Sequence, residues 1–167
     1  MLVIFSGLPG VGKTTMAREL ARQIGAAHVR IDSIEQAMRG AATGNRPLDD
    51  VGYRVAYAVA ADNLRIGRTV VADSVNPLQV TRDAWVRVAQ RAGVKAVEIE
   101  VTCPAAEEHR RRVESRVVDI PGMTIPTWAD VVGREYHSWD REHLVIDSAS
   151  RTIEENVRLI RAALCKA

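Results

Sequence analysis

The sequence has few cysteines, few aromatic side chains and no large excess of charge. Only two of its 167 residues are cysteine, Cys103 and Cys165. Two cysteines so far apart match no metal-binding spacing, so we expect free thiols and a cytoplasmic protein. Aromatic residues make up 4% of the chain, which argues against a surface that stacks nucleic-acid bases. The net charge of +2 also argues against the broad basic field of a nucleic-acid-binding protein.

Long apolar runs are also missing. No stretch approaches the roughly 20 residues that a helix needs to cross a bilayer, so we expect no membrane span. The apolar first residues lead directly into a glycine-rich segment, which argues against a signal peptide. With 47% hydrophobic and 26% charged residues, a chain of this length predicts one globular domain over residues 1–167.

The glycine-rich segment GLPGVGKT matches the pattern G-x-x-x-x-G-K-[ST]. The apolar residues 2–5 predict a buried strand before it, and the spacing of residues 16–24 predicts a helix after it. The glycines let backbone N–H groups point into one hollow beside the positive end of that helix, which makes an anion site. The alternative is a plain turn between strand and helix. We expect these residues to contact the phosphates of ATP: Gly7, Leu8, Pro9, Gly10, Val11, Gly12, Lys13, Thr14 and Thr15.

Within this pattern, two side chains have specific roles. Lys13 is expected to reach the β- and γ-phosphates, and the Thr14 hydroxyl to ligate Mg²⁺.

The rest of the chain alternates between predicted strands and helices. Further strands are predicted at residues 28–31, 69–72, 94–101 and 144–146. Further helices are predicted at residues 33–38, 51–66, 77–92, 104–116, 127–139 and 152–164, with loops at 39–50 and 117–126. This alternation predicts an α/β fold, in which helices cover both faces of a parallel sheet. Ligands of such sheets bind at the carboxyl ends of the strands.

Two aspartates follow predicted strands. Asp32 comes after the second strand, where it could accept the proton of an attacking hydroxyl. Alternatively, Asp32 and Glu35 have the spacing of a reciprocal helix cap. Asp73 ends the third strand, where an aspartate could help to hold Mg²⁺ or simply form a turn.

Two polar residues beyond Asp73 are candidates for contact with the substrate. Asn76 precedes Pro77, which fits a helix cap as well as a substrate contact. Arg82 lies further along the same predicted helix and could face either the site or water.

The basic run EEHRRRVESR suggests a lid. Glu108 and Arg112 form a stabilising i,i+4 pair, but Arg112 and Arg116 are also four apart and repel each other unless an anion lies between them. The loop that follows contains proline and glycine. We therefore expect a lid segment, about residues 105–126, that closes over ATP and whose arginines stabilise the transferring phosphoryl group.

The histidines and tryptophans are not expected to take part in binding or catalysis. The four histidines have no metal-ligand spacing and are expected to be structural or exposed. Trp85, Trp128 and Trp139 are expected on helices, as anchors in the core.

Together, these residues resemble the small phosphate-loop kinases of the adenylate-kinase-like group. VADSVNPLQVTRDAW is similar to the polynucleotide-kinase-like ATPases of the small AAA type, and IDSIEQAM is similar to chloramphenicol phosphotransferase. The resemblance implies a three-layer P-loop NTPase fold with a five-stranded parallel sheet in the order 2-3-1-4-5. It also implies Mg-ATP as the donor, Asp32 as the base, and lid arginines on the γ-phosphate.

The acceptor is less defined. We expect a kinase that transfers the γ-phosphate of ATP to a hydroxyl of a small molecule. Polynucleotide kinases usually carry an arginine where this chain has Glu35, which argues against a polynucleotide 5′-hydroxyl acceptor. A polynucleotide 5′-hydroxyl kinase, a nucleotide-driven switch and a binding module without turnover stay as alternatives. The sequence gives no indication of the oligomeric state.

Overall fold

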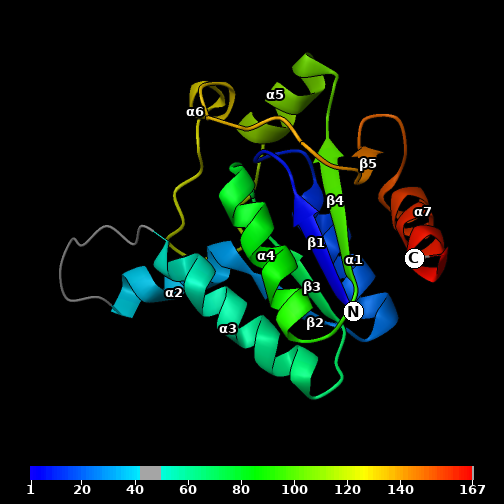
Figure 1. The fold of residues 1–167 in the computed structure, drawn as a ribbon. Helices are drawn as coiled ribbons and strands as arrows, with labels where there is room; N and C mark the ends of the chain where they lie inside the picture. The colour runs from blue at the N-terminus through cyan, green and yellow to red at the C-terminus, as the bar shows by residue number, and fades with distance from the viewer. Residues whose placement is uncertain (42–49, 167) are drawn as a thin grey trace.

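Five short apolar segments form a parallel sheet in the order β2-β3-β1-β4-β5 (Figure 1). The computed structural model describes residues 1–41 and 50–166. The strands are β1 (Leu2–Ser6), β2 (Ala27–Arg30), β3 (Val70–Asp73), β4 (Ala96–Thr102) and β5 (Leu144–Asp147). The predicted α/β class and the predicted strand order are both confirmed.

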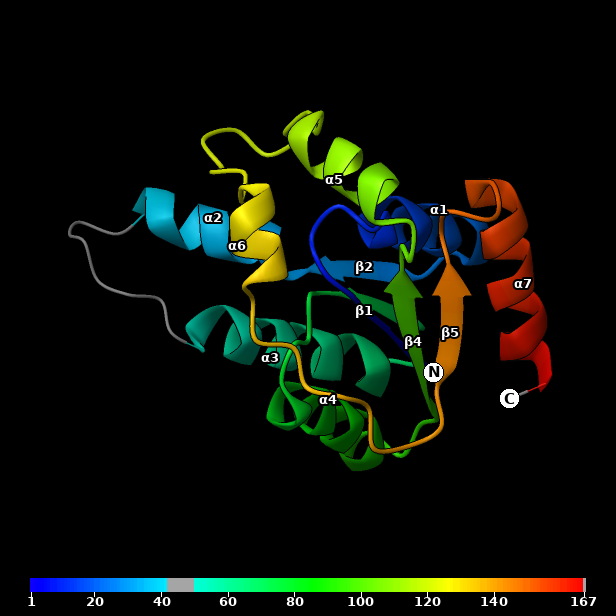
Figure 2. The ribbon, with the colours of Figure 1, turned by 90° about the horizontal axis from the view of Figure 1, so that it is seen from above.

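Helices cover both faces of the sheet, so the molecule has three layers (Figure 2). The helices are α1 (Lys13–Ile24), α2 (Ile31–Ala41), α3 (Val51–Arg65), α4 (Gln79–Arg91), α5 (Ala106–Glu114), α6 (Trp128–Val132) and α7 (Ile153–Lys166). Seen from above, α1 and α7 lie on one side of the strands, and α3 and α4 lie on the other. Helices α5 and α6 lie near the carboxyl ends of the strands (Figure 1).

The central strand β1 shows why the sheet is buried on both faces. All five of its residues are buried, and successive side chains point to opposite faces. Val3 and Phe5 pack with α1 and α7, whereas Leu2 and Ile4 pack with α3 and α4. A continuous apolar run is therefore what a central parallel strand requires.

The chain between α5 and β5 is less helical than its sequence pattern predicts. The helix predicted over residues 127–139 ends at Val132, and Gly133 follows it. Trp139 therefore lies outside a helix, and it stacks on His143 at 3.9 Å between ring centroids. Trp128 is half-buried, so among the three tryptophans only Trp85 is a core anchor.

Two other helices, α2 and α5, begin and end at residues other than those predicted. Helix α2 begins directly after β2, at Ile31, and reaches Ala41. Most of the loop predicted at 39–50 lies outside the described residues. Helix α5 ends at Glu114, so Arg116 is not part of it.

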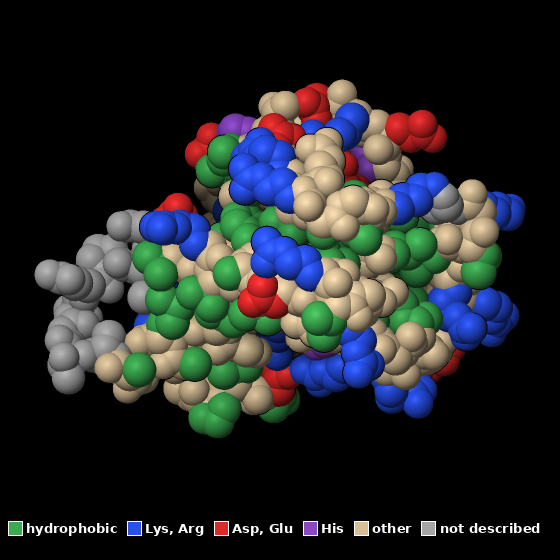
Figure 3. Space-filling view, turned by 60° about the horizontal axis from the view of Figure 1, so that its bottom comes forward, with side chains coloured by type: hydrophobic (Ala, Val, Ile, Leu, Met, Phe, Trp, Pro, Cys, Tyr) green, Lys and Arg blue, Asp and Glu red, His purple; other side chains and the backbone are tan. Residues whose placement is uncertain are grey.

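The surface shows no single basic field on the face drawn in Figure 3. Lys and Arg side chains lie there in separate groups, with apolar and uncharged side chains between them. In the part of the chain that the structure describes, every helix is too short or too polar to cross a membrane.

Candidate nucleotide and acceptor site

The glycine-rich loop between β1 and α1 is a tight turn that admits no larger residue at its start. Gly7 has φ +139°, and a Cβ built on it would lie 2.3 Å from the carbonyl oxygen of Val101. Its N–H donates to the carbonyl of Val75 at 3.0 Å, which ties the loop to the end of β3. Gly12 has φ +90° and immediately precedes the first residue of α1. The loop thus leads directly to the positive end of a helix.

Lys13 and Thr14 lie at the end of this loop, close to Asp73. The Thr14 hydroxyl donates to Asp73 Oδ1 at 3.3 Å. The Lys13 side chain is 7% exposed, and burial lowers the pKa of its ammonium group although Asp73 and Asp32 oppose this shift. A buried cation beside a positive helix end is a site that favours an anion.

Asp73 is a buried carboxylate that stays ionised. Burial alone would raise its pKa, but the hydrogen bond from His28 and the charge of Lys13 outweigh burial and lower the pKa. Within the described residues, no group of three His, Cys, Asp or Glu side chains could hold a metal ion. A Mg²⁺ ion at this point would therefore need phosphate oxygens and water beside Thr14 and Asp73, which is how this cation is usually held.

Two residues of β2 that were not predicted from the sequence also lie at the site. His28 Nε2 lies 3.3 Å from Asp73 Oδ2, and Arg30 is paired with Asp73 in the strand register. The guanidinium of Arg30 also donates to Asp119 at 2.8 Å. His28 and Arg30 flank the buried Val29, so both point to the face opposite to it.

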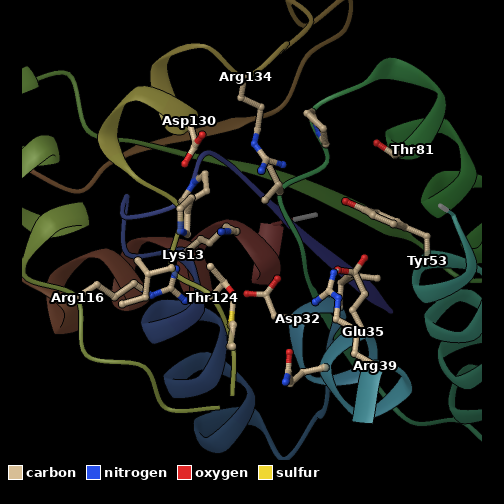
Figure 4. A pocket seen from close by; sticks show the side chains of 18 of the residues that line it. Lys13, Asp32, Glu35, Arg39, Tyr53, Thr81, Arg116, Thr124, Asp130 and Arg134 are labelled. Atoms are coloured by element: carbon tan, nitrogen blue, oxygen red, sulfur yellow. The ribbon is translucent and has the colours of Figure 1, made fainter. Parts of the chain in front are cut away.

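Asp32 lies in the first turn of α2 and lines a cleft of about 850 Å³. Figure 4 shows its carboxylate between Lys13 and Arg116 on one side and Glu35 and Arg39 on the other. The apolar part of the lining consists of Pro9, Ile31, Val75, Pro77, Leu78, Met123, Ile125 and Pro126. A hydroxyl compound in this cleft would have both a carboxylate and apolar surface to contact.

The structure does not show the reciprocal cap of Asp32 and Glu35. Glu35 Oε2 pairs instead with Arg39 at 3.5 Å. Its side chain packs on α3, where a Cβ built on Gly52 would lie 2.5 Å from Glu35 Cγ. Burial raises the pKa of Glu35, and the charge of Arg39 opposes that shift.

A smaller cavity of about 170 Å³ adjoins the glycine-rich loop. It is lined by Gly10, Gly12, Lys13, Thr14, Thr15, Arg112 and Arg116. Arg112 pairs with Glu108 at 2.6 Å, as the i,i+4 spacing predicts, and it also donates to the Ser148 hydroxyl at 2.9 Å. The two arginines therefore meet at one cavity, although Arg116 reaches it from beyond the end of α5.

Helix α5 rests directly on the glycine-rich loop. His109 Nε2 lies 2.8 Å from the carbonyl oxygen of Pro9, so the ring can donate a hydrogen bond to the loop. A Cβ built on Gly10 would lie 2.5 Å from a methyl group of Val113. This close packing fixes the start of the lid segment against the loop.

Asn76 lines neither of the two cavities, and the N-cap of α4 is Leu78 rather than Asn76. Its side chain is completely buried. The amide nitrogen donates to Phe5 O at 3.1 Å and Ser6 Oγ at 3.0 Å. The amide oxygen accepts from Ser74 Oγ at 2.8 Å and Trp85 Nε1 at 3.1 Å. Both donors and both acceptor positions are used, so Asn76 fixes the backbone after β3 and has none left for a ligand.

Arg82 is likewise bound by the protein itself and lines neither of the two cavities. It is 1% exposed, and its guanidinium donates to the carbonyls of Asn76 at 2.9 Å and His137 at 2.7 Å. It also lies 4.2 Å from the ring centroid of Trp139. Arg82 thus holds the chain around residue 137 against α4.

We expect the Arg82→Met substitution to lower the free energy of unfolding by about 3 kcal/mol, because it leaves buried carbonyls without donors. Urea denaturation should show a lower midpoint with an unchanged slope. Arg87→Met, at an exposed position of the same helix, is the control and should have little effect. Unchanged stability together with a raised KM for an acceptor would restore the substrate-contact interpretation.

Comparisons with known proteins support the likeness that the motifs suggest. The sequence profile of a family described as AAA domain matches residues 2–125, whereas no curated protein matches the sequence. The fold is similar to that of the Mycobacterium tuberculosis APS kinase in complex with AMPPNP and APS. The TM-score is 0.72 at 19% identity, covering 98% of this chain and 96% of that chain.

Two further solved structures have the same architecture. Chaetomium thermophilum Kti12 in complex with ADP-AlF3 gives a TM-score of 0.70 at 20% identity, covering 98% of both chains. A gluconokinase of Sinorhizobium meliloti 1021 gives 0.66 at 17% identity, covering 98% of this chain and 91% of that chain. The resemblance to small P-loop kinases is thereby confirmed at the level of the fold.

Proposed function

Because this chain belongs to the AAA domain family and has a P-loop kinase fold, we propose that it is an ATP-dependent kinase. It transfers the γ-phosphate of Mg-ATP to a hydroxyl of a small-molecule acceptor. One observation carries this proposal: Lys13 and Arg116 line both the cavity at the glycine-rich loop and the larger cleft that contains Asp32. The terminal phosphate of a triphosphate bound in the cavity would therefore face an acceptor bound in the larger cleft.

The residues at the loop fit a bound Mg-triphosphate. The backbone of residues 7–15 would surround the β- and γ-phosphates, and at Gly12 the atom nearest to a built Cβ among the described residues is the Met16 methyl group at 3.9 Å, which leaves room for an oxygen. Thr14 and Asp73 would hold the ion. Mg²⁺ would supply charge neutralisation for the phosphates.

Side chains of the protein accept the proton and stabilise the charge that develops during transfer. Asp32 accepts the proton as the acceptor oxygen forms its bond to phosphorus and the bond to the leaving ADP oxygen breaks. Lys13, Arg112 and Arg116 stabilise the charge that develops on the phosphoryl oxygens. The lid segment, residues 105–126, excludes water from the closed site, and the whole chain acts as one kinase domain.

The direct test is transfer of label from γ-labelled ATP to a panel of acceptors. The panel contains nucleosides, 5′-hydroxyl oligonucleotides, adenylyl sulfate, sugars, and aminoglycoside and phenicol antibiotics. Labelling of a small hydroxyl compound supports the proposal. Labelling of oligonucleotides alone would show a polynucleotide kinase. Release of phosphate without any labelled acceptor would favour a nucleotide-driven switch.

We expect Mg-ATP to raise the melting temperature, because a ligand that binds only the folded state stabilises it. At about 100 times Kd the gain is about 2.7 kcal/mol, which for a chain of this size corresponds to a shift of about 5–10 °C. Differential scanning fluorimetry measures it, with adenosine as the control because it lacks phosphates for the loop. An equal shift of melting temperature with adenosine would contradict the proposal that the glycine-rich loop binds the phosphates.

A further inference from the structure

Arg30, the last residue of β2, is a buried cation among three carboxylates. Its side chain is 6% exposed. Nη1 donates to Asp119 at 2.8 Å, Nη2 lies 3.7 Å from Asp32 Oδ2, and Nε lies 4.0 Å from Asp73 Oδ2. Two of these carboxylates are the proposed base and the proposed metal-holding residue. The third belongs to the lid segment.

The guanidinium of Arg30 is poorly placed for stability alone. Its Nε and Nη2 are buried and have no hydrogen-bond partner among the described residues. Buried N–H groups without partners are unfavourable, so an arginine selected only for packing would be expected to satisfy them. The two nitrogens lie instead within ion-pair distance of Asp32 and Asp73, at separations longer than a hydrogen bond, so the attraction between them is electrostatic.

Asp119 connects this cluster to the loop that follows α5, which we call the lid loop (residues 115–126). Besides Arg30, its carboxylate pairs with Arg18 on α1. The hydrogen bond from Arg30 is the main cause that holds the pKa of Asp119 below its usual range. Asp119 therefore stays ionised, and one buried and one exposed cation anchor the lid loop.

The anchor lies between two parts of the lid loop that line the proposed acceptor cleft. Arg116 lines it three residues before Asp119, and residues 122–126 line it after Asp119. Fixing the loop at Asp119 consequently fixes the position of Arg116 and the wall that faces Asp32.

We propose that Arg30 is a positioning residue that couples the lid loop to the catalytic carboxylates. Through Asp119 it holds the lid loop in place, and through its other two nitrogens it orients Asp32 and Asp73. Its kinetic consequences rest on the proposed kinase function, but the coupling itself does not.

The test compares Asp119→Asn, Arg30→Gln, Arg30→Lys, the double variant Arg30→Gln/Asp119→Asn and Arg18→Gln. Asp62→Asn, which alters an exposed ion pair on α3, is the matched control. Hydrogen exchange of the amides in 115–126 should rise about tenfold in Asp119→Asn and Arg30→Gln and change less in Arg18→Gln. If the exchange rates rise only for these amides and the melting temperature is unchanged, the lid loop has loosened and the protein has not unfolded.

Kinetics separate the two roles of Arg30. Asp119→Asn should mainly raise KM, because binding must then order the lid loop, whereas Arg30→Gln should also lower kcat by about tenfold or more. Arg30→Lys keeps the charge and should recover part of kcat. The double variant should lose less than the product of the single losses, because both changes break one connection.

The outcomes are unambiguous. Exchange in 115–126 equal to that of the Asp62→Asn control, or single effects that multiply fully in the double variant, would overturn the coupling. If no acceptor is ever phosphorylated but exchange rises as described, the proposed function fails and the coupling stands. Should Arg30→Gln not fold, Asp119→Asn tests the coupling by itself, because exchange in 115–126 at the level of the Asp62→Asn control would overturn it.

Discussion

Replacing Asp32 with asparagine is expected to lower kcat by about 10²–10⁴-fold, the usual contribution of a positioned general base. Asparagine has nearly the same shape but cannot accept a proton at neutral pH. Asp32 is not part of the glycine-rich loop, and its carboxylate faces the cleft, so affinity for Mg-ATP should be retained. Single-turnover transfer to the identified acceptor measures the rate, and calorimetry with a non-hydrolysable ATP analogue measures the affinity.

The control for this prediction is Asp62→Asn, which makes the same chemical change at an exposed position. It should leave both rate and affinity unchanged. A carboxylate in the first turn also stabilises a helix through its dipole, so Asp32→Asn could lower stability slightly. If the variant transfers phosphate at the parent rate and only melts earlier, this helix effect is the whole role of Asp32.

Much of the fold could be predicted because its signals are local. An apolar run, a glycine turn and a helix follow one another within the first 24 residues, and each is specified by its own sequence. The alternation of strands and helices then predicts a covered parallel sheet. The strand order came from the resemblance to P-loop kinases, because periodicity does not say which strands are neighbours.

The missed residues are those whose role depends on pairing between distant strands. Arg30 and His28 approach Asp73 because β2 pairs with β3 in one particular register. In the sequence, the only sign is two polar residues flanking Val29 in an otherwise apolar strand. Such a pattern is equally typical of an edge strand that faces water.

Asn76 and Arg82 show the opposite case. Their positions in the sequence allowed a contact with the substrate as well as another role, and in the structure both bind backbone groups of the protein itself. Asn76 has a positive φ of +48°, and its amide nitrogen donates to Phe5 and Ser6 of β1, a contact between distant segments that the local sequence does not specify. A polar side chain near a site can form hydrogen bonds with a substrate or with the protein's own backbone. Only the three-dimensional contacts distinguish these two cases.

Replacing Lys13 with methionine is expected to lower kcat/KM by about 10³-fold, because it removes a preorganised charge from the transferring phosphates. Methionine has a similar length and no charge, so the cavity keeps its shape. The melting temperature without nucleotide should change little, because relief of the Lys13 desolvation is offset by the loss of its charge beside the buried Asp73. The shift of melting temperature on adding Mg-ATP should become small.

Lys95→Met is the matched control, because Lys95 is exposed and far along the chain from the loop. It should leave transfer and the Mg-ATP shift at the parent values. The combination expected for Lys13→Met, little change in stability with lost transfer, is typical of a residue retained for its function. A variant with a lower melting temperature that still binds Mg-ATP and transfers phosphate at the parent rate would show that Lys13 stabilises the fold. The proposal that the glycine-rich loop binds the phosphates through Lys13 would then be wrong.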